Sequence, residues 1–169
     1  MENARSAVDY SMKAVMALAA MLVVQSLHMV EHIAQVIQKY VLHLAKAQGV
    51  LGAVFDLEWI HFAYNTWLFL ALVLAYVWFR RTRSAHVPFV LTAAVWFQGW
   101  HEMEHVVKML QYYLLGITVG PKGILGFVVP LVWLHFWYNF IVLAMIIGAF
   151  VAVLNRSRTI QPAGSGAIA

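Results

Sequence analysis

The chain has 169 residues, of which 63% are hydrophobic and only 11% are charged, and its formal net charge is +4. A soluble domain is normally about 45–50% apolar and about 25% charged, so this composition excludes an ordinary soluble protein. The absence of cysteine excludes disulfides, thiolate metal sites, iron–sulfur clusters and cysteine nucleophiles. The basic residues stand at the ends of apolar runs, which is typical of a membrane protein and argues against nucleic acid as a partner.

Four segments are long and apolar enough to cross a bilayer as helices, which takes about 20 residues each. They run from near Lys13 past Val30, from Trp59 to Phe79, from Val87–Pro88 past Trp100, and within the stretch Ile124 to Leu154. Residues 159–169 are mostly small or polar and predict a flexible tail. We therefore expect an all-α, integral membrane four-helix bundle that forms a single domain over residues 1–169.

An even number of spans brings both termini and the loop 80–86 to one side of the membrane. That side carries all six arginines, namely Arg5, Arg80, Arg81, Arg83, Arg156 and Arg158, together with Lys13. The other side carries Lys39, Lys46, Lys108 and Lys122, and also Asp56 and Glu58. Because cytoplasmic loops carry an excess of Lys and Arg, we expect both termini in the cytoplasm.

An internal repeat relates the two halves of the chain. Its best-matched part is the pattern Q-x-x-H-x-x-E-H, which occurs at Gln25–His32 and again at Gln98–His105. The match continues with Gln38 and Gln111, Tyr40 and Tyr113, Gly49–Gly52 and Gly123–Gly126, and Trp59–Asn65 and Trp133–Asn139. Shared hydrophobicity does not explain polar residues that match in register on two helices. We expect two tandem helical-hairpin repeats, about 12–80 and about 87–155, that cross the membrane in the same direction.

The repeat also predicts a cluster of ionisable side chains inside the bundle. Residues at i, i+3 and i+4 share a helix face, so His28, Glu31 and His32 project together. Counting 1.5 Å per residue places the histidines of all four helices at one level, near the outer membrane boundary. Imidazole and carboxylate without thiolate suit iron, zinc, copper or manganese. We expect eight residues to bind transition metal: His28, Glu31, His32, His61, His101, Glu104, His105 and His135.

Six further repeated residues are expected to orient these ligands through hydrogen bonds: Gln25, Gln98, Asn65, Asn139, Tyr64 and Tyr138. The alternatives are hydrogen bonding between helices for the amides and anchoring at the membrane interface for the tyrosines. The ligand set suffices for two ions, each with three histidines and one glutamate or with both glutamates bridging. We expect the first and third helices to lie close together, with Glu31 and Glu104 facing each other, an arrangement that bridging requires.

The leading functional hypothesis is a membrane oxidoreductase or oxygenase with a dinuclear, iron-type centre that acts on an apolar or quinone-like substrate. One alternative is a non-catalytic metal transporter, chaperone or accessory subunit of a larger membrane complex, which the small size of the chain favours. A second alternative is a bis-His haem b protein, although haem explains neither the glutamates nor three histidines per repeat. A third is a metal-free network of hydrogen bonds between helices. The expected partners are the lipid bilayer and either a larger complex or further copies of the chain, and no catalytic residue is assigned.

Overall fold

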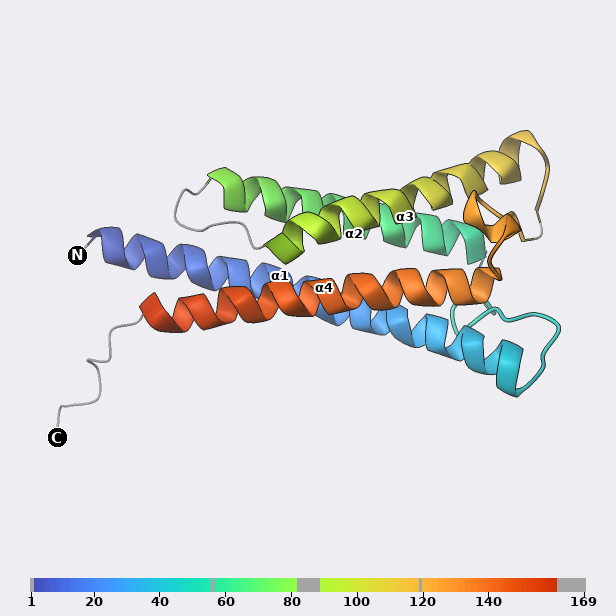
Figure 1. Ribbon diagram of the computed structural model, residues 1–169, viewed down its shortest axis with the longest axis horizontal. Coiled ribbons are helices and arrows are strands. Elements are labelled where there is room, and N and C mark those ends of the chain that lie inside the picture. The colour runs from blue at the N-terminus through green and yellow to red at the C-terminus, as the bar shows by residue number, and fades with distance from the viewer. Residues whose placement is uncertain (1, 56, 82–88, 119, 161–169) are drawn as a thin grey trace.

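The computed structural model describes residues 2–55, 57–81, 89–118 and 120–160. This part of the chain forms four long helices, α1 (Glu2–Val36), α2 (Leu57–Arg81), α3 (Phe89–Leu114) and α4 (Leu131–Ile160) (Figure 1). A short π-helical turn, η1 (Ile37–Val41), continues α1, and a 3-10 turn, η2 (Leu125–Phe127), precedes α4. The expected all-helical class is confirmed. Of the expected tail, residues 159–160 belong to α4, and residues 161–169 lie outside the described residues.

The helices run side by side, with the start of α1 and the end of α4 at one end of the bundle (Figure 1). The connections after α1 and after α3 lie at the opposite end, which we call the loop end. α1 packs along α4, α2 packs along α3, and α3 also packs along α4, whereas α1 and α2 touch only lightly. The expectation that the first and third helices lie close together is wrong, because in the described part of the chain α1 packs along α4 and not along α3. The two most extensive contacts, of α1 with α4 and of α2 with α3, instead join each helix of one predicted repeat to a helix of the other.

An apolar core fills the half of the bundle nearer the termini. Its fully buried side chains come from all four helices and include Leu18, Leu68, Leu72, Leu91, Val142 and Ile146. Small residues between them, such as Ala14 and Ala94, allow the helices to approach closely. The buried polar side chains of the described chain all lie in the other half, toward the loop end. The bundle interior is therefore divided into an apolar half and a polar half.

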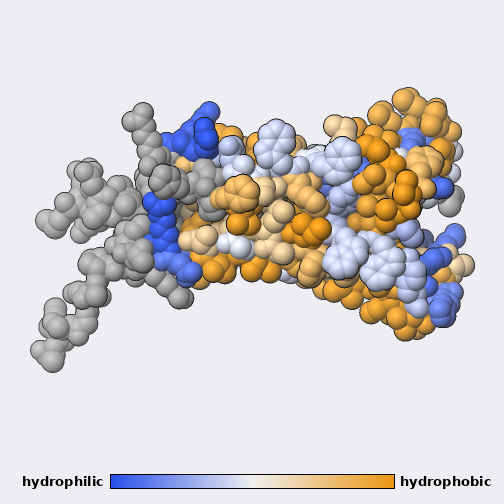
Figure 2. All heavy atoms as spheres, in the orientation of Figure 1, coloured by the Kyte–Doolittle hydropathy of each residue, from blue (hydrophilic) through white to orange (hydrophobic). Residues whose placement is uncertain are grey.

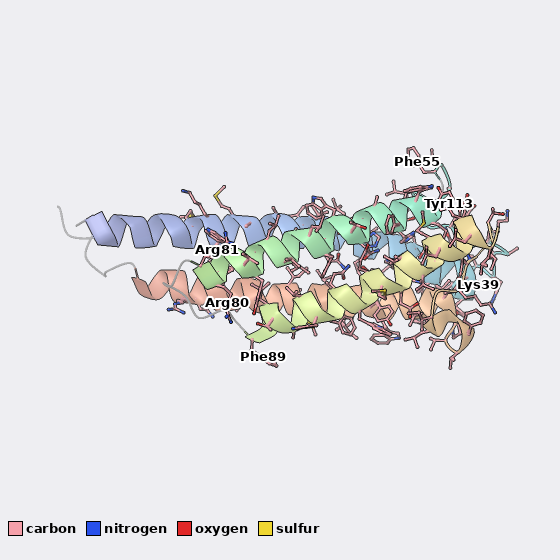
Figure 3. The ribbon with its side chains drawn as sticks, turned by 90° about the horizontal axis from the view of Figure 1, so that it is seen from above. Lys39, Phe55, Arg80, Arg81, Phe89 and Tyr113 are labelled. Carbon is pink, nitrogen blue, oxygen red and sulfur yellow. The ribbon has the colours of Figure 1, made fainter. Side chains whose placement is uncertain are left out.

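The exterior of the bundle is apolar along its middle, with hydrophilic residues gathered toward the two ends (Figure 2). Arg80 and Arg81 lie at the end near the termini, and Lys39 and Tyr113 lie at the loop end (Figure 3). Three segments are long and apolar enough to cross a membrane: Met12–Val41, Glu58–Arg81 and Leu131–Arg156. Three of the four expected spans thus meet the requirements of length and composition.

Candidate metal centre

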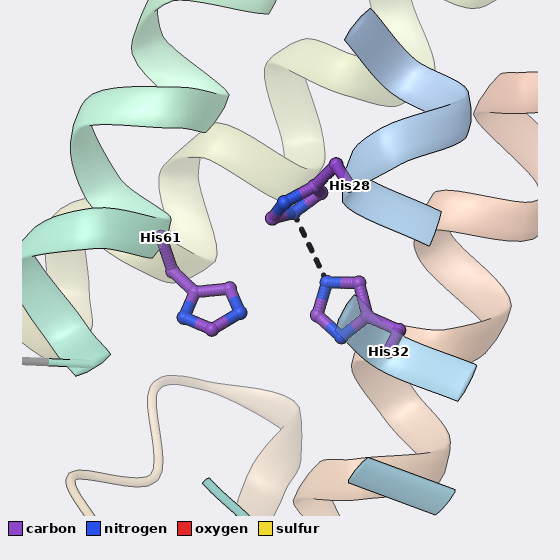
Figure 4. A group of neighbouring side chains, drawn as sticks. All are labelled: His28, His32 and His61. Atoms are coloured by element: carbon purple, nitrogen blue, oxygen red, sulfur yellow. Dashed lines mark hydrogen bonds between the residues drawn. The ribbon is translucent and has the colours of Figure 1, made fainter. Parts of the chain in front are cut away.

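Two triads of buried histidines lie in the polar half of the bundle. The first joins His28 and His32 of α1 with His61 of α2 (Figure 4). The second joins two histidines of α3 with one of α4, namely His101, His105 and His135. Within each triad, one ring nitrogen of each residue lies within 4.8 Å of those of the other two. Nitrogens around a tetrahedral zinc ion lie about 3.3 Å apart, so a small inward movement allows each triad to hold an ion.

The two triads touch each other and form one continuous cluster. The rings of His61 and His105 are nearly parallel, with centroids 6.1 Å apart, and those of His32 and His135 lie at the same separation. The rings of His61 and His135 are 6.3 Å apart. No ring of the cluster is more than 6% exposed. The arrangement can therefore accommodate two ions in neighbouring, water-poor sites.

Two asparagines fix the orientation of one histidine in each triad. Asn139 Nδ2 donates to His32 Nε2 at 2.9 Å, and Asn65 Nδ2 donates to His105 Nε2 at 3.1 Å. An amide nitrogen donates only, so the accepting Nε2 atoms of these two histidines carry the lone pair. These atoms also lie 3.0 Å from His28 Nε2 and 3.2 Å from His101 Nε2, respectively. Each of these Nε2 lone pairs is therefore occupied by hydrogen bonds, and a metal ion that binds there would displace the asparagine.

A second set of hydrogen bonds selects tautomers that suit metal binding. His32 Nδ1 donates to Gln35 Oε1 at 2.9 Å, and His135 Nδ1 donates to the carbonyl of Leu131 at 2.8 Å. The Nε2 atom of His135 then carries a buried lone pair, and it has no hydrogen-bond partner among the described residues. Leaving such a group unpaired costs about 1–3 kcal/mol. Metal-binding histidines commonly donate their other ring nitrogen to a carbonyl in this way.

The six residues expected to orient the ligands all lie against the cluster. Gln25 Nε2 donates to Asn139 Oδ1 at 3.1 Å, and Gln98 Nε2 makes the matching bond to Asn65 Oδ1 at 3.0 Å. The rings of Tyr64 and His28 stack with centroids 3.8 Å apart. In the second half of the chain, Tyr138 stacks on His101 at 4.6 Å. The amides therefore support the asparagines, and each tyrosine covers one histidine.

The two repeated glutamates, Glu31 and Glu104, lie at the loop end of the cluster, and each binds the connection that follows its own helix. Glu31 accepts hydrogen bonds from the backbone N–H groups of Val50 at 2.8 Å and Leu51 at 3.1 Å. In the same way, Glu104 accepts from the N–H groups of Ile124 and Leu125, at 2.6 Å and 2.9 Å. Both carboxylates are engaged within their own half of the chain, which differs from the expected pairing across the bundle. Metal coordination by these two glutamates stays a prediction.

Sequence reasoning missed a polar layer on the loop side of the histidines. Lys108 and Glu58, which the sequence places on the outer side of the membrane, form an ion pair with Nζ and Oε2 2.7 Å apart, and their side chains are only 7% and 12% exposed. On α3, the buried Glu102 accepts a hydrogen bond from the Thr66 hydroxyl at 2.6 Å. Lys108 follows His105 by three residues, just as Gln35 follows His32. That i+3 spacing was a signal that both side chains lie on the face of the ligands.

A partly open pocket of about 390 Å³ at the loop end connects this polar layer to the cluster. One histidine of each triad lines it, His61 from the first and His135 from the second. Its other polar lining comprises Gln35, Lys46, Gln48, Glu58, Lys108 and Thr118, and its apolar lining includes Phe55, Leu131 and Val132. A small molecule in this pocket would therefore meet both halves of the cluster.

Comparison with known proteins leaves the site as the sole basis for assigning a function. No protein-family model matches the chain, and no curated protein and no solved structure is significantly similar to it. Residue geometry and chemistry therefore carry the functional argument, and no activity is transferred from another protein.

Proposed function

We propose that this chain is a membrane-embedded metal protein that binds two transition-metal ions, one in each histidine triad, and uses them as an oxidoreductase or oxygenase. The observation that carries the proposal is the pair of adjoining, buried three-histidine clusters. Ionisable groups within membrane segments are expensive and are usually retained for function. Hydrogen bonds that orient the rings, with a lone pair left buried at His135, favour metal binding over a metal-free network.

The ligand chemistry supports a redox-active metal with open coordination positions. Imidazole suits iron and copper as well as zinc, and three protein ligands per ion leave room for oxygen or a substrate. The pocket that reaches His61 and His135 provides access to such positions. Iron or copper is therefore the cofactor that fits the proposed activity, and zinc would indicate a hydrolytic or structural centre instead.

The apolar half of the bundle argues against the alternative of metal transport. Fully buried leucines, including Leu18, Leu68 and Leu72, fill the space between the cluster and the end near the termini. Among the described residues, no buried polar side chain lies in that half. An ion that enters from the loop end thus meets a closed apolar core, which favours a retained metal centre.

We further infer that the chain is a tandem duplication with α3 as its fourth span and with both termini in the cytoplasm. Matching contacts recur in the two halves: the Gln38 and Gln111 side chains both bond the backbone of a loop glycine, Gly49 and Gly123 respectively. The charged residues, the histidines and Gln98 of α3 are buried, whereas its exposed face carries Phe89, Trp96, Trp100, Met103 and Leu110. An apolar outer face with an inward polar stripe is what a span that lines a site requires.

Metal analysis of the full chain, purified in mild detergent, tests the proposed function. We expect two ions per chain, one ion in His28→Ala or His101→Ala, and none in the double variant, because each substitution opens one triad. His43→Asn is the matched control, since His43 is exposed, has a positive φ that asparagine tolerates, and belongs to neither triad. A wild-type chain without metal, or a double variant with wild-type metal content, would falsify the proposal.

A further inference from the structure

The charge of the proposed metal centre is not balanced by its ligands. Histidine binds metal as a neutral imidazole, so two triads of histidine leave the full positive charge of two ions in place. Charge that is buried in a water-poor bundle requires a partner of opposite sign. This inference rests on the proposed metal binding, and it asks which group supplies the negative charge.

Four carboxylates near the cluster supply part of this negative charge. Glu31 and Glu104 accept backbone hydrogen bonds from the loops. Glu58 pairs with Lys108, and Glu102 is bound by the Thr66 hydroxyl on α2. Among the described residues, these groups account for the glutamates that adjoin the cluster. Together with Lys108, the ionised carboxylates carry three net negative charges, one fewer than two divalent ions require, so a single anionic ligand from outside the protein completes the balance.

The pocket at the loop end is the place where such a ligand would reach the ions. It is lined by His61 and His135, and its volume of about 390 Å³ suits a small organic molecule. Its described lining contains two lysines, Lys46 and Lys108, but a single acid, Glu58. The lining is thus positive on balance, which favours an anion over a cation.

The two halves of the chain contribute differently charged residues to the pocket. The second half of the chain has Lys108 where the first half has Gln35, and the first half has Glu58 where the second has Val132. The Lys108 ammonium has three N–H donors, and a bond to Glu58 uses one of them. Its neighbour His105 has an Nδ1 atom with no partner among the described residues, whereas the equivalent atom of His32 bonds Gln35. In the first half, the Gln35 side chain bonds His32, whereas in the second half Lys108 occupies the equivalent position and presents an N–H donor to a ligand in the pocket.

We propose that this pocket binds a small organic carboxylate, which coordinates the metal of the second triad and accepts a hydrogen bond from Lys108. The carboxylate supplies the missing negative charge. Its organic part packs against the apolar lining of Phe55, Leu131 and Val132, which an inorganic oxyanion would not use. Lys108 is thus a positioning residue for the ligand, and Glu58 holds its side chain in place.

Cobalt(II) and benzoate are the probes for the test, because the visible spectrum of cobalt reports a change of ligand. We expect benzoate to bind the cobalt-loaded full chain saturably and more tightly than inorganic phosphate. The double variant Lys108→Gln/Glu58→Val copies the residues of the first half and leaves no orphaned charge. It should keep its cobalt but bind benzoate about tenfold more weakly or worse, the effect of losing one charge-assisted hydrogen bond. Lys122→Gln removes an exposed lysine outside the pocket and should match the wild type.

Wild-type benzoate affinity in the double variant would overturn the proposal, and so would phosphate that binds as tightly as benzoate. If the double variant loses cobalt, the wild type still decides the question through linkage. Because coupling between two ligands is reciprocal, benzoate must raise the cobalt affinity of the wild type above that measured in perchlorate at equal ionic strength. An unchanged cobalt affinity would reject carboxylate binding. Failure of the wild type to bind any metal would instead reject the proposed function.

Discussion

Glu31 shows that a buried carboxylate beside a candidate metal centre can also hold a backbone loop in place. The side chain is 4% exposed and accepts N–H groups of the connection that follows α1. Hydrogen bonds to an ionised acceptor are roughly twice as strong as neutral ones, so they can fix a loop that lacks regular structure. Gly49 has a φ of +73° and lies directly over the carboxylate, where an added Cβ would collide with Glu31 Oε1. The pairing of glutamate and glycine therefore explains why both are repeated in the second half, as Glu104 and Gly123.

We predict that Gly49→Ala destabilises the protein more than Gly116→Ala does. Both glycines have a positive φ, +73° and +64°, so each alanine incurs a backbone strain of about 1–2 kcal/mol. Only at Gly49 does the methyl group also displace a carboxylate, because nothing lies within 4 Å of a Cβ at Gly116. The additional loss should be about 1–3 kcal/mol in the free energy of unfolding, measured by denaturant titration in detergent. Equal losses for the two variants would mean that the glutamate does not anchor the loop in solution.

The hydrogen bond from His32 to Gln35 provides a second prediction at the level of single residues. Gln35→Leu removes the acceptor of His32 Nδ1, so the ring loses the contact that fixes its tautomer and orientation. Loss of such supporting contacts typically weakens metal binding by about 10–100-fold. Metal titration of the purified variant measures this change. Ser26→Leu, at an exposed site on the same helix, is the control and should bind like the wild type; an equal loss there would refute a specific role for Gln35.

For α3, the mean hydropathy of the sequence and the burial of the side chains in the structure lead to different conclusions about membrane insertion. Glu102, Glu104 and Lys108 lower its mean hydropathy, and it is not among the three helices apolar enough by composition alone. The structure buries all three of these side chains. Mean hydropathy sums over all faces of a helix, whereas lipid contacts only the outer face. A helix that lines a polar site is therefore undervalued by its composition.

Lipid exposure of α3 can be tested with single cysteines, since the chain has none of its own. We expect Trp96→Cys, on the exposed apolar face, to resist a water-soluble maleimide in intact membranes and to react after detergent solubilisation and unfolding. Lys122→Cys, beyond the end of α3, should react in both conditions. Rapid labelling of the cysteine at 96 in membranes would exclude α3 as a span.

For the molecule as a whole, the charge bias predicts a direction of insertion. Arg80 and Arg81 lie at the end of the bundle that also holds the start of α1 and the end of α4. If this end is cytoplasmic, Arg81→Cys should react with an impermeant maleimide only after the membrane is opened. Lys122→Cys, at the loop end, should react in sealed cells. The reverse pattern would place the metal centre near the cytoplasmic face.

Residue types and their spacing were enough to predict helices, an apolar exterior and clustered histidines. Those properties follow from local composition and from the 3.6-residue helical period, and both can be read directly from the sequence. The pairing of α1 with α4 and of α2 with α3 was beyond such reasoning, because it depends on contacts such as Gln25 with Asn139, over a hundred residues apart. The hydrogen-bond partners of Glu31 and Glu104 could also be identified only from the tertiary structure, since helical spacing places a side chain on a face but does not identify its partner. For the same reason, Lys108 and Glu58 could be recognised as a buried ion pair only once α2 and α3 were seen packed together.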